Sequence, residues 1–192
     1  MSVLELITRA DERGLAASGV ACLERCLPSS DDGTGAEALR PLWASCGNGK
    51  DWAARLVAAS EALEGATPPD AGRAAADRVR DLVRAAPEEF AEEPLRAWSD
   101  ACSLLALEVH QEYDLPAPDG GEGLERLRTG EAEDAGPLVM GELRRQIAIL
   151  ELLAETEGPA GGGAGLRRAL DLSTEGQRVL KAALSRRARG RT

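Results

Sequence analysis

The sequence predicts an all-α fold, a single-domain helical bundle of six to eight helices. Three observations support this class. Apolar residues recur at steps of three and four along most of the chain. No segment alternates β-branched and polar residues as a strand does, and the valines occur within helical patterns. Stretches rich in glycine and proline separate the periodic segments, as expected for short connections between antiparallel helices.

Composition narrows the class of protein. The chain has 192 residues, of which 43% are hydrophobic and 29% charged, enough for one domain with its own core. No apolar run approaches the eighteen or so residues of a membrane span, and the first residues do not resemble a secretory signal. We therefore expect a cytoplasmic protein with four reduced cysteines. The abundance of Ala, Gly, Arg, Leu and Glu is typical of a high-GC bacterium.

We expect three parts along the chain: an acidic helical core over residues 1–157, a glycine-rich linker over 158–165, and C-terminal helices with a basic tail over 166–192, packed on the same domain. The net charge is −10. From residue 164 onward, eight basic residues against two acidic ones give +6, which leaves −16 on the preceding residues. The body therefore repels nucleic acid and anionic membranes, and the tail has no aromatic residues for stacking on bases. Neither is an expected partner.

The first half of the chain predicts four helices and a corner. The first helix contains Gly14 and Gly19, so we expect a kink or close packing of its backbone against a neighbour. Phe90 lies in a corner bounded by prolines and is expected to point inward. The four helices are expected over residues 2–27, 34–46, 51–63 and 70–86, and the corner over 87–93.

The segment 94–115 predicts the most apolar helix, which we expect at the centre of the bundle against the helix 137–157. It carries the only histidine and the only tyrosine, His110 and Tyr113. Its apolar stripe recurs at steps of three and four and consists of Leu95, Trp98, Cys102, Leu105 and Val109.

The helix 137–157 has two apolar flanks, more than one neighbouring helix would cover. Two interpretations remain open. The helix lies at the centre of its own bundle, or its surplus face contacts a second copy or another protein. The candidate interface residues are Val139, Met140, Leu143, Ile147 and Leu150. Two short helices, over 166–172 and 173–187, complete the expected elements; Thr174 and Gln177 have the spacing of a capping box.

Candidate binding residues cluster on the segment 94–115. Trp98, Cys102, His110 and Tyr113 could line a pocket between helices. A single histidine excludes two-histidine metal sites, and no nucleophile is partnered to it, so we assign no catalytic residue, no metal and no cofactor. Arg167 and Arg168, after a glycine-rich stretch, could hold an anion; a plain linker is the alternative.

These observations predict a helical protein-protein interaction or regulatory module without catalytic activity. It would act on its own kind, as a homodimer, or on another protein. The alternative is a small-molecule-binding protein or an enzyme with a pocket around Trp98, His110 and Tyr113.

Overall fold

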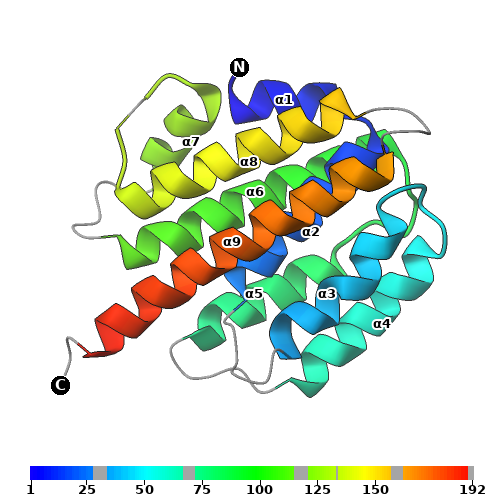
Figure 1. Cartoon of the computed structure of the whole chain (residues 1–192), viewed down its shortest axis with the longest axis horizontal. Helices are drawn as coiled ribbons and strands as arrows, with labels where there is room; N and C mark the ends of the chain where they lie inside the picture. Colours follow the sequence, from blue (N-terminus) through cyan, green and yellow to red (C-terminus); the bar gives the residue numbers. More distant parts are fainter. Residues whose placement is uncertain (28–33, 67–71, 115–120, 133, 157–161, 190–192) are drawn as a thin grey trace.

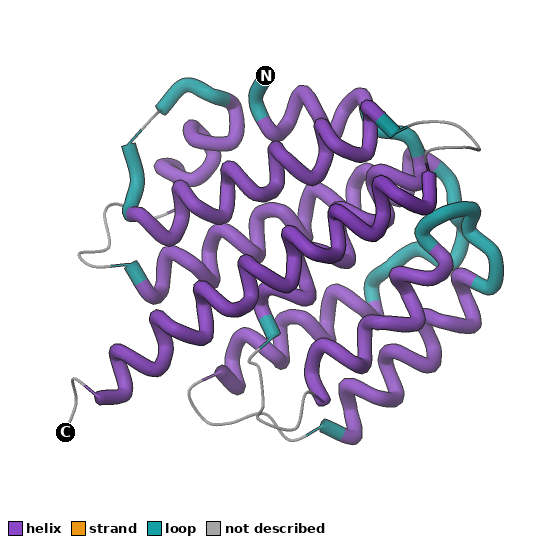
Figure 2. Tube along the Cα trace, viewed as in Figure 1, coloured by secondary structure: helices purple, strands orange, loops and turns teal. Residues whose placement is uncertain are grey.

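The computed structural model describes residues 1–27, 34–66, 72–114, 121–132, 134–156 and 162–189 (Figures 1 and 2). Within these ranges the chain forms helices and loops and contains no strand, so the predicted all-α class is confirmed. None of the helices in these ranges is long and apolar enough to cross a bilayer. In chain order the helices are α1 (Val3–Arg9), α2 (Glu12–Cys26), α3 (Thr34–Ser45), α4 (Trp52–Gly65), α5 (Arg73–Arg84), α6 (Glu92–Tyr113), α7 (Gly121–Thr129), α8 (Pro137–Glu155) and α9 (Gly162–Arg189).

The described residues contain nine helices, not six to eight. The expected first helix is divided, because Ala10 is extended and the Asp11 side chain accepts a hydrogen bond from the Gly14 amide, which begins α2. Residues 121–129, where the sequence predicts at most a short helical turn over 124–127, form the helix α7. Its Arg128 side chain is buried and forms ion pairs with Glu125 and with Asp100 of α6, which fixes α7 on the bundle.

The two expected C-terminal helices are one helix, α9, which includes Gly162 to Gly165 of the expected linker. The residues expected to cap a new helix instead lie inside α9. Thr174 donates to the Leu170 carbonyl one turn earlier. Gln177 donates to the carbonyls of Glu24 and Leu27, at the C-terminal end of α2, and Ser173 donates to Oε2 of the buried Glu24 at 2.5 Å.

The centre of the bundle is α2, not the expected pair α6 and α8. Every residue of α2 from Arg13 to Cys26 is buried, and the helix contacts α3, α5, α6, α8 and α9. Small residues on α2 permit this close packing. At Gly19 a Cβ atom would lie 2.5 Å from Cζ3 of Trp98 on α6, so only glycine fits without a shift. The close approach expected at Gly19 is confirmed.

α6 and α8 pack on α2 and on each other, and α8 lies at the front of the bundle between α9 and the α1/α7 pair (Figure 1). The α3 and α4 helices pack side by side at the other end. There Phe90 packs edge-on against Trp52 with ring centroids 5.4 Å apart, as its expected inward position requires. One face of α8 consequently points into the core and the other points outward.

Candidate functional site: the two faces of α8

The inner face of α8 carries a fully buried ion pair. Glu142 lies opposite Arg25 of α2, and both side chains have 0% exposure. The guanidinium donates from Nε to Oε2 at 2.8 Å and from Nη2 to Oε1 at 2.6 Å. This bidentate geometry fixes the orientation of the guanidinium relative to the carboxylate. Burial by itself would raise the pKa of Glu142, but the Arg25 charge and hydrogen bonds outweigh it and lower that pKa below its ordinary value. Glu142 is therefore a carboxylate at neutral pH.

Gln146 extends this pair to α6. Its Nε2 donates to Oε1 of Glu142 at 3.0 Å and to the backbone carbonyl of Ser103 at 3.2 Å. Its Oε1 accepts a hydrogen bond from the Ser103 hydroxyl at 2.6 Å. We call Arg25, Ser103, His110, Glu142 and Gln146 the inner cluster; each is at most 1% exposed. The cluster joins α2, α6 and α8 through directed bonds between buried groups.

His110 lies at the edge of the inner cluster as a neutral imidazole. Its Nδ1 is 2.7 Å from the Ala106 carbonyl, which can only accept, so Nδ1 carries the hydrogen. Nε2 lies 3.6 Å from Oε2 of Glu142 and has no hydrogen-bond partner among the described residues. Burial lowers the pKa of His110, and the opposing charge of Glu142 does not reverse this.

The cysteines nearby are buried thiols. Burial raises the pKa of Cys22 to about 12, and those of Cys26 and Cys102 are raised well above the ordinary value, also by burial. A thiolate is the reactive form of cysteine, so these groups are unreactive at neutral pH. In the described ranges no group of three or more His, Cys, Asp or Glu residues is placed to hold a metal ion.

The four residues proposed for a pocket on α6 face different surroundings. Trp98 donates its indole hydrogen to the Leu82 carbonyl at 2.9 Å and lies edge-on to Trp52. Cys102 and His110 are fully buried in the core, and Tyr113 is half-buried near the end of α6. The two surface grooves beside α8 are lined by other residues. A ligand site around Trp98, Cys102, His110 and Tyr113 remains a prediction from the sequence.

The candidate interface residues divide between the two faces of α8. Val139, Leu143 and Leu150 are buried within the chain, whereas Met140 and Ile147 are half-buried. Met140, Leu143 and Ile147 line a groove of about 630 Å³ between α8, α1 and α7. Its apolar floor includes Val3 and Leu127.

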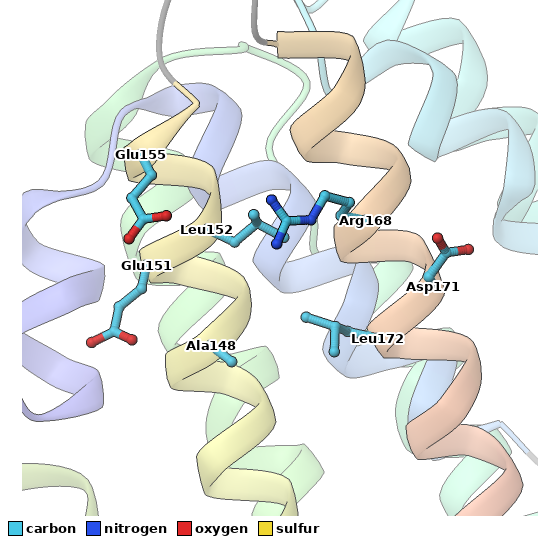
Figure 3. Close-up of a pocket in the computed structure, with 7 residues that line it drawn as sticks. All are labelled: Ala148, Glu151, Leu152, Glu155, Arg168, Asp171 and Leu172. Atoms are coloured by element: carbon cyan, nitrogen blue, oxygen red, sulfur yellow. The ribbon is translucent and has the colours of Figure 1, made fainter.

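A second groove, of about 450 Å³, lies on the other side of α8, between its C-terminal half and α9 (Figure 3). Arg168 extends from α9 toward α8 across Leu152, whereas Glu151 and Glu155 extend away from α9. The two anion candidates therefore differ: Arg168 lines this groove, and Arg167, also exposed on α9, does not. Residue 161 of the glycine-rich stretch lies outside the described residues.

Sequence reasoning missed most of the inner cluster. Arg25, Ser103, Glu142 and Gln146 were not singled out, although Glu142 and Gln146 occur three and seven residues after Val139, on the apolar stripe of α8. Polar residues inside an apolar stripe are the signal that could have found them. Comparisons of the chain with protein-family models, with curated proteins and with solved structures found no match.

Proposed function

We propose that this protein is a helical protein-interaction module without catalytic activity, and that its contact surface is the outward side of α8. We call the residues Met140, Arg144, Ile147, Ala148, Glu151 and Glu155 the outer face. Their spacing places them on one side of the helix. The observation that carries the proposal is a contrast in burial and pairing. The polar groups of the inner cluster are buried and mostly bonded to one another, whereas the charged groups of the outer face are exposed and form no ion pair among the described residues.

The chemistry of the inner cluster supports a non-catalytic role. The imidazole, the carboxylate and the thiols that could act on a substrate are buried, and most of the polar atoms are engaged with one another. A general acid or base must come within hydrogen-bond reach of its substrate, and these groups are buried among α2, α6 and α8.

The composition of the outer face supports contact with a protein. Ile147 and Met140 leave apolar surface beside a groove, and Arg144 and Glu151 are exposed beside them. Neither charge forms an ion pair with another residue of the described ranges. An apolar strip rimmed by charges is typical of protein contact surfaces, and a flexible methionine adapts to the shape of a partner.

A site-specific photo-crosslinker tests this proposal in cells that naturally produce the protein. A benzophenone amino acid replaces Ala148 on the outer face, and in a matched control it replaces the exposed Ala58 on α4. We expect one discrete protein adduct from position 148, lost when Arg144→Glu is added, and none from position 58. The absence of an adduct at 148, or equal adducts from both positions, would overturn the proposal.

A further inference from the structure

We infer that the occupant of the outer face is a second copy of this chain, packed antiparallel on the first about a two-fold axis between Ile147 and Ala148. This inference rests on the proposed function and names its partner. In a two-fold contact the same patch serves both copies, so each contact between different residues occurs twice.

The charges of α8 are self-complementary in this arrangement. Arg144 and Glu151 lie at equal distances on either side of the axis, so Arg144 of each copy faces Glu151 of the other. Both side chains are exposed on α8, and each lacks an ion-pair partner within the described part of its own chain. A parallel alignment would instead place arginine on arginine and glutamate on glutamate, which disfavours it.

The apolar residues of the outer face lie where this axis passes. Ile147 and Ala148 are half-buried and meet their counterparts at the centre, and Met140 flanks them. The two grooves follow the same symmetry. The N-terminal half of α8 borders the groove with α1 and α7, and the C-terminal half borders the groove with α9. In the antiparallel pair the N-terminal half of each α8 meets the C-terminal half of the other. At each end of the contact, the α1/α7 groove of one copy therefore lies beside the α9 groove of the other.

The size of the contact indicates a reversible dimer. A helix of 19 residues is about 28 Å long, and a crossing of two such helices with the rims of two grooves lies at the small end of specific interfaces. Dissociation constants in the micromolar range are expected for contacts of this class.

Sedimentation equilibrium of the full chain, from about 1 to 500 μM, tests the arrangement through charge reversal, since interfaces of this size dissociate in that range. We expect the wild type to interconvert between monomer and dimer. Arg144→Glu and Glu151→Arg should each weaken the dimer about tenfold or more, because each replaces two attractive pairs by two repulsive ones. The double variant restores both pairs and should return to within about threefold of the wild type, as should an equimolar mixture of the single variants.

Arg178→Glu is the matched control, since it reverses an exposed arginine on α9 that lines neither of the two grooves beside α8. It should leave the dimer unchanged, and circular dichroism should show equal helix content in all variants. A wild type that is monomeric throughout, a double variant that stays weak, or an equal loss in Arg178→Glu would overturn the inference. If the crosslink from position 148 nevertheless joins the chain to a different protein, the proposed function stands and only the second copy is wrong.

Discussion

The two faces of α8 place the same kinds of residue in opposite situations. On the inner face, Glu142 meets Arg25 at 0% exposure and shares its hydrogen bonds with Gln146. On the outer face, two and nine residues further along α8, Arg144 and Glu151 are exposed and have no ion-pair partner among the described residues. The inner charges are satisfied by the fold itself, whereas the outer charges can be satisfied only by water or by another molecule.

This difference indicates what each face contributes. A buried pair gains strong attraction but must give up hydration, so its net contribution to stability is small while both partners are present. Its geometry, however, is highly directional, so it fixes how α2, α6 and α8 align. The outer charges cost the fold almost nothing and can be used to select a partner. Substitutions on the inner and outer faces test this division.

The largest effect is expected from breaking the inner pair. Glu142→Ala leaves the Arg25 guanidinium buried without a counter-charge, which should lower the free energy of unfolding by about 3 to 5 kcal/mol. Urea denaturation at pH 7 measures this change. Replacing both partners by leucine, as Arg25→Leu with Glu142→Leu, should recover most of the loss because no uncompensated charge remains.

The outer charges provide the control for this measurement. Arg144→Ala and Glu151→Ala should each change the free energy of unfolding by less than about 0.5 kcal/mol, at protein concentrations where the chain is monomeric. Equal losses in the free energy of unfolding for Glu142→Ala and Glu151→Ala would show that the inner and outer charges contribute alike to stability.

Two glycines near the inner pair, Gly176 and Gly141, should give smaller effects on stability when replaced by alanine, and the two effects should have opposite signs. Gly176 of α9 lies over the cluster, and a Cβ there would be 2.4 Å from Cδ of Arg25 and 2.9 Å from Cδ of Arg145. Because Glu142 holds Arg25 in place, Gly176→Ala should cost about 1 to 3 kcal/mol. At Gly141 of α8 the nearest atom would be 3.5 Å away, at the end of the flexible Arg145 side chain.

Gly141→Ala should therefore stabilise the protein by up to about 1 kcal/mol through helix propensity alone. Thermal unfolding of the two variants beside the wild type measures both changes. A neutral or stabilising Gly176→Ala would mean that Arg25 can move and that the inner cluster is not a fixed arrangement.

The helical class could be predicted from the sequence because it depends on local periodicity, which each segment displays by itself. The central position of α2 could not. Its residues Ala16, Ala17, Gly19 and Ala21 give a weak apolar signal, yet small residues are what permit several helices to approach one backbone. The larger apolar residues of α6 and α8 gave the stronger pattern and led to the wrong centre.

The candidate site was predictable only in part for a related reason. Met140 and Ile147 follow from the surplus of apolar residues on α8, and the structure leaves both half-buried beside a groove. The pairing of Arg25 with Glu142 joins residues 117 positions apart, and no spacing within one helix encodes it. Similarly, Thr174 and Gln177 have the spacing of a capping box, but Thr174 bonds to Leu170 within α9 and Gln177 binds the end of α2, because that end lies beside α9.

The smallest effect is a pH dependence of the stability that the inner cluster contributes through His110. Burial lowers the pKa of His110, assisted by the charges of Arg25 and Arg145, while Glu142 and the Ala106 carbonyl oppose it only in part. In the unfolded chain the histidine regains its ordinary pKa of about 6.5. The unfolded state therefore binds more protons as the pH falls through that value, and stability declines, with a limiting slope of about 1.4 kcal/mol per pH unit for one proton.

Urea denaturation at intervals from pH 7.5 to 5, compared between wild type and His110→Gln, isolates this contribution. Glutamine does not titrate, so the wild type should lose stability relative to the variant as the pH falls below about 6.5. Glu142, whose pKa is below its ordinary value, adds a loss in the same direction only at lower pH, as the pH falls through its folded pKa. Parallel curves would mean that His110 titrates alike in the folded and unfolded chains. A wild type that gains stability relative to the variant on acidification would mean that the imidazole pairs with Glu142 as a cation, contrary to the neutral ring assigned to the inner face.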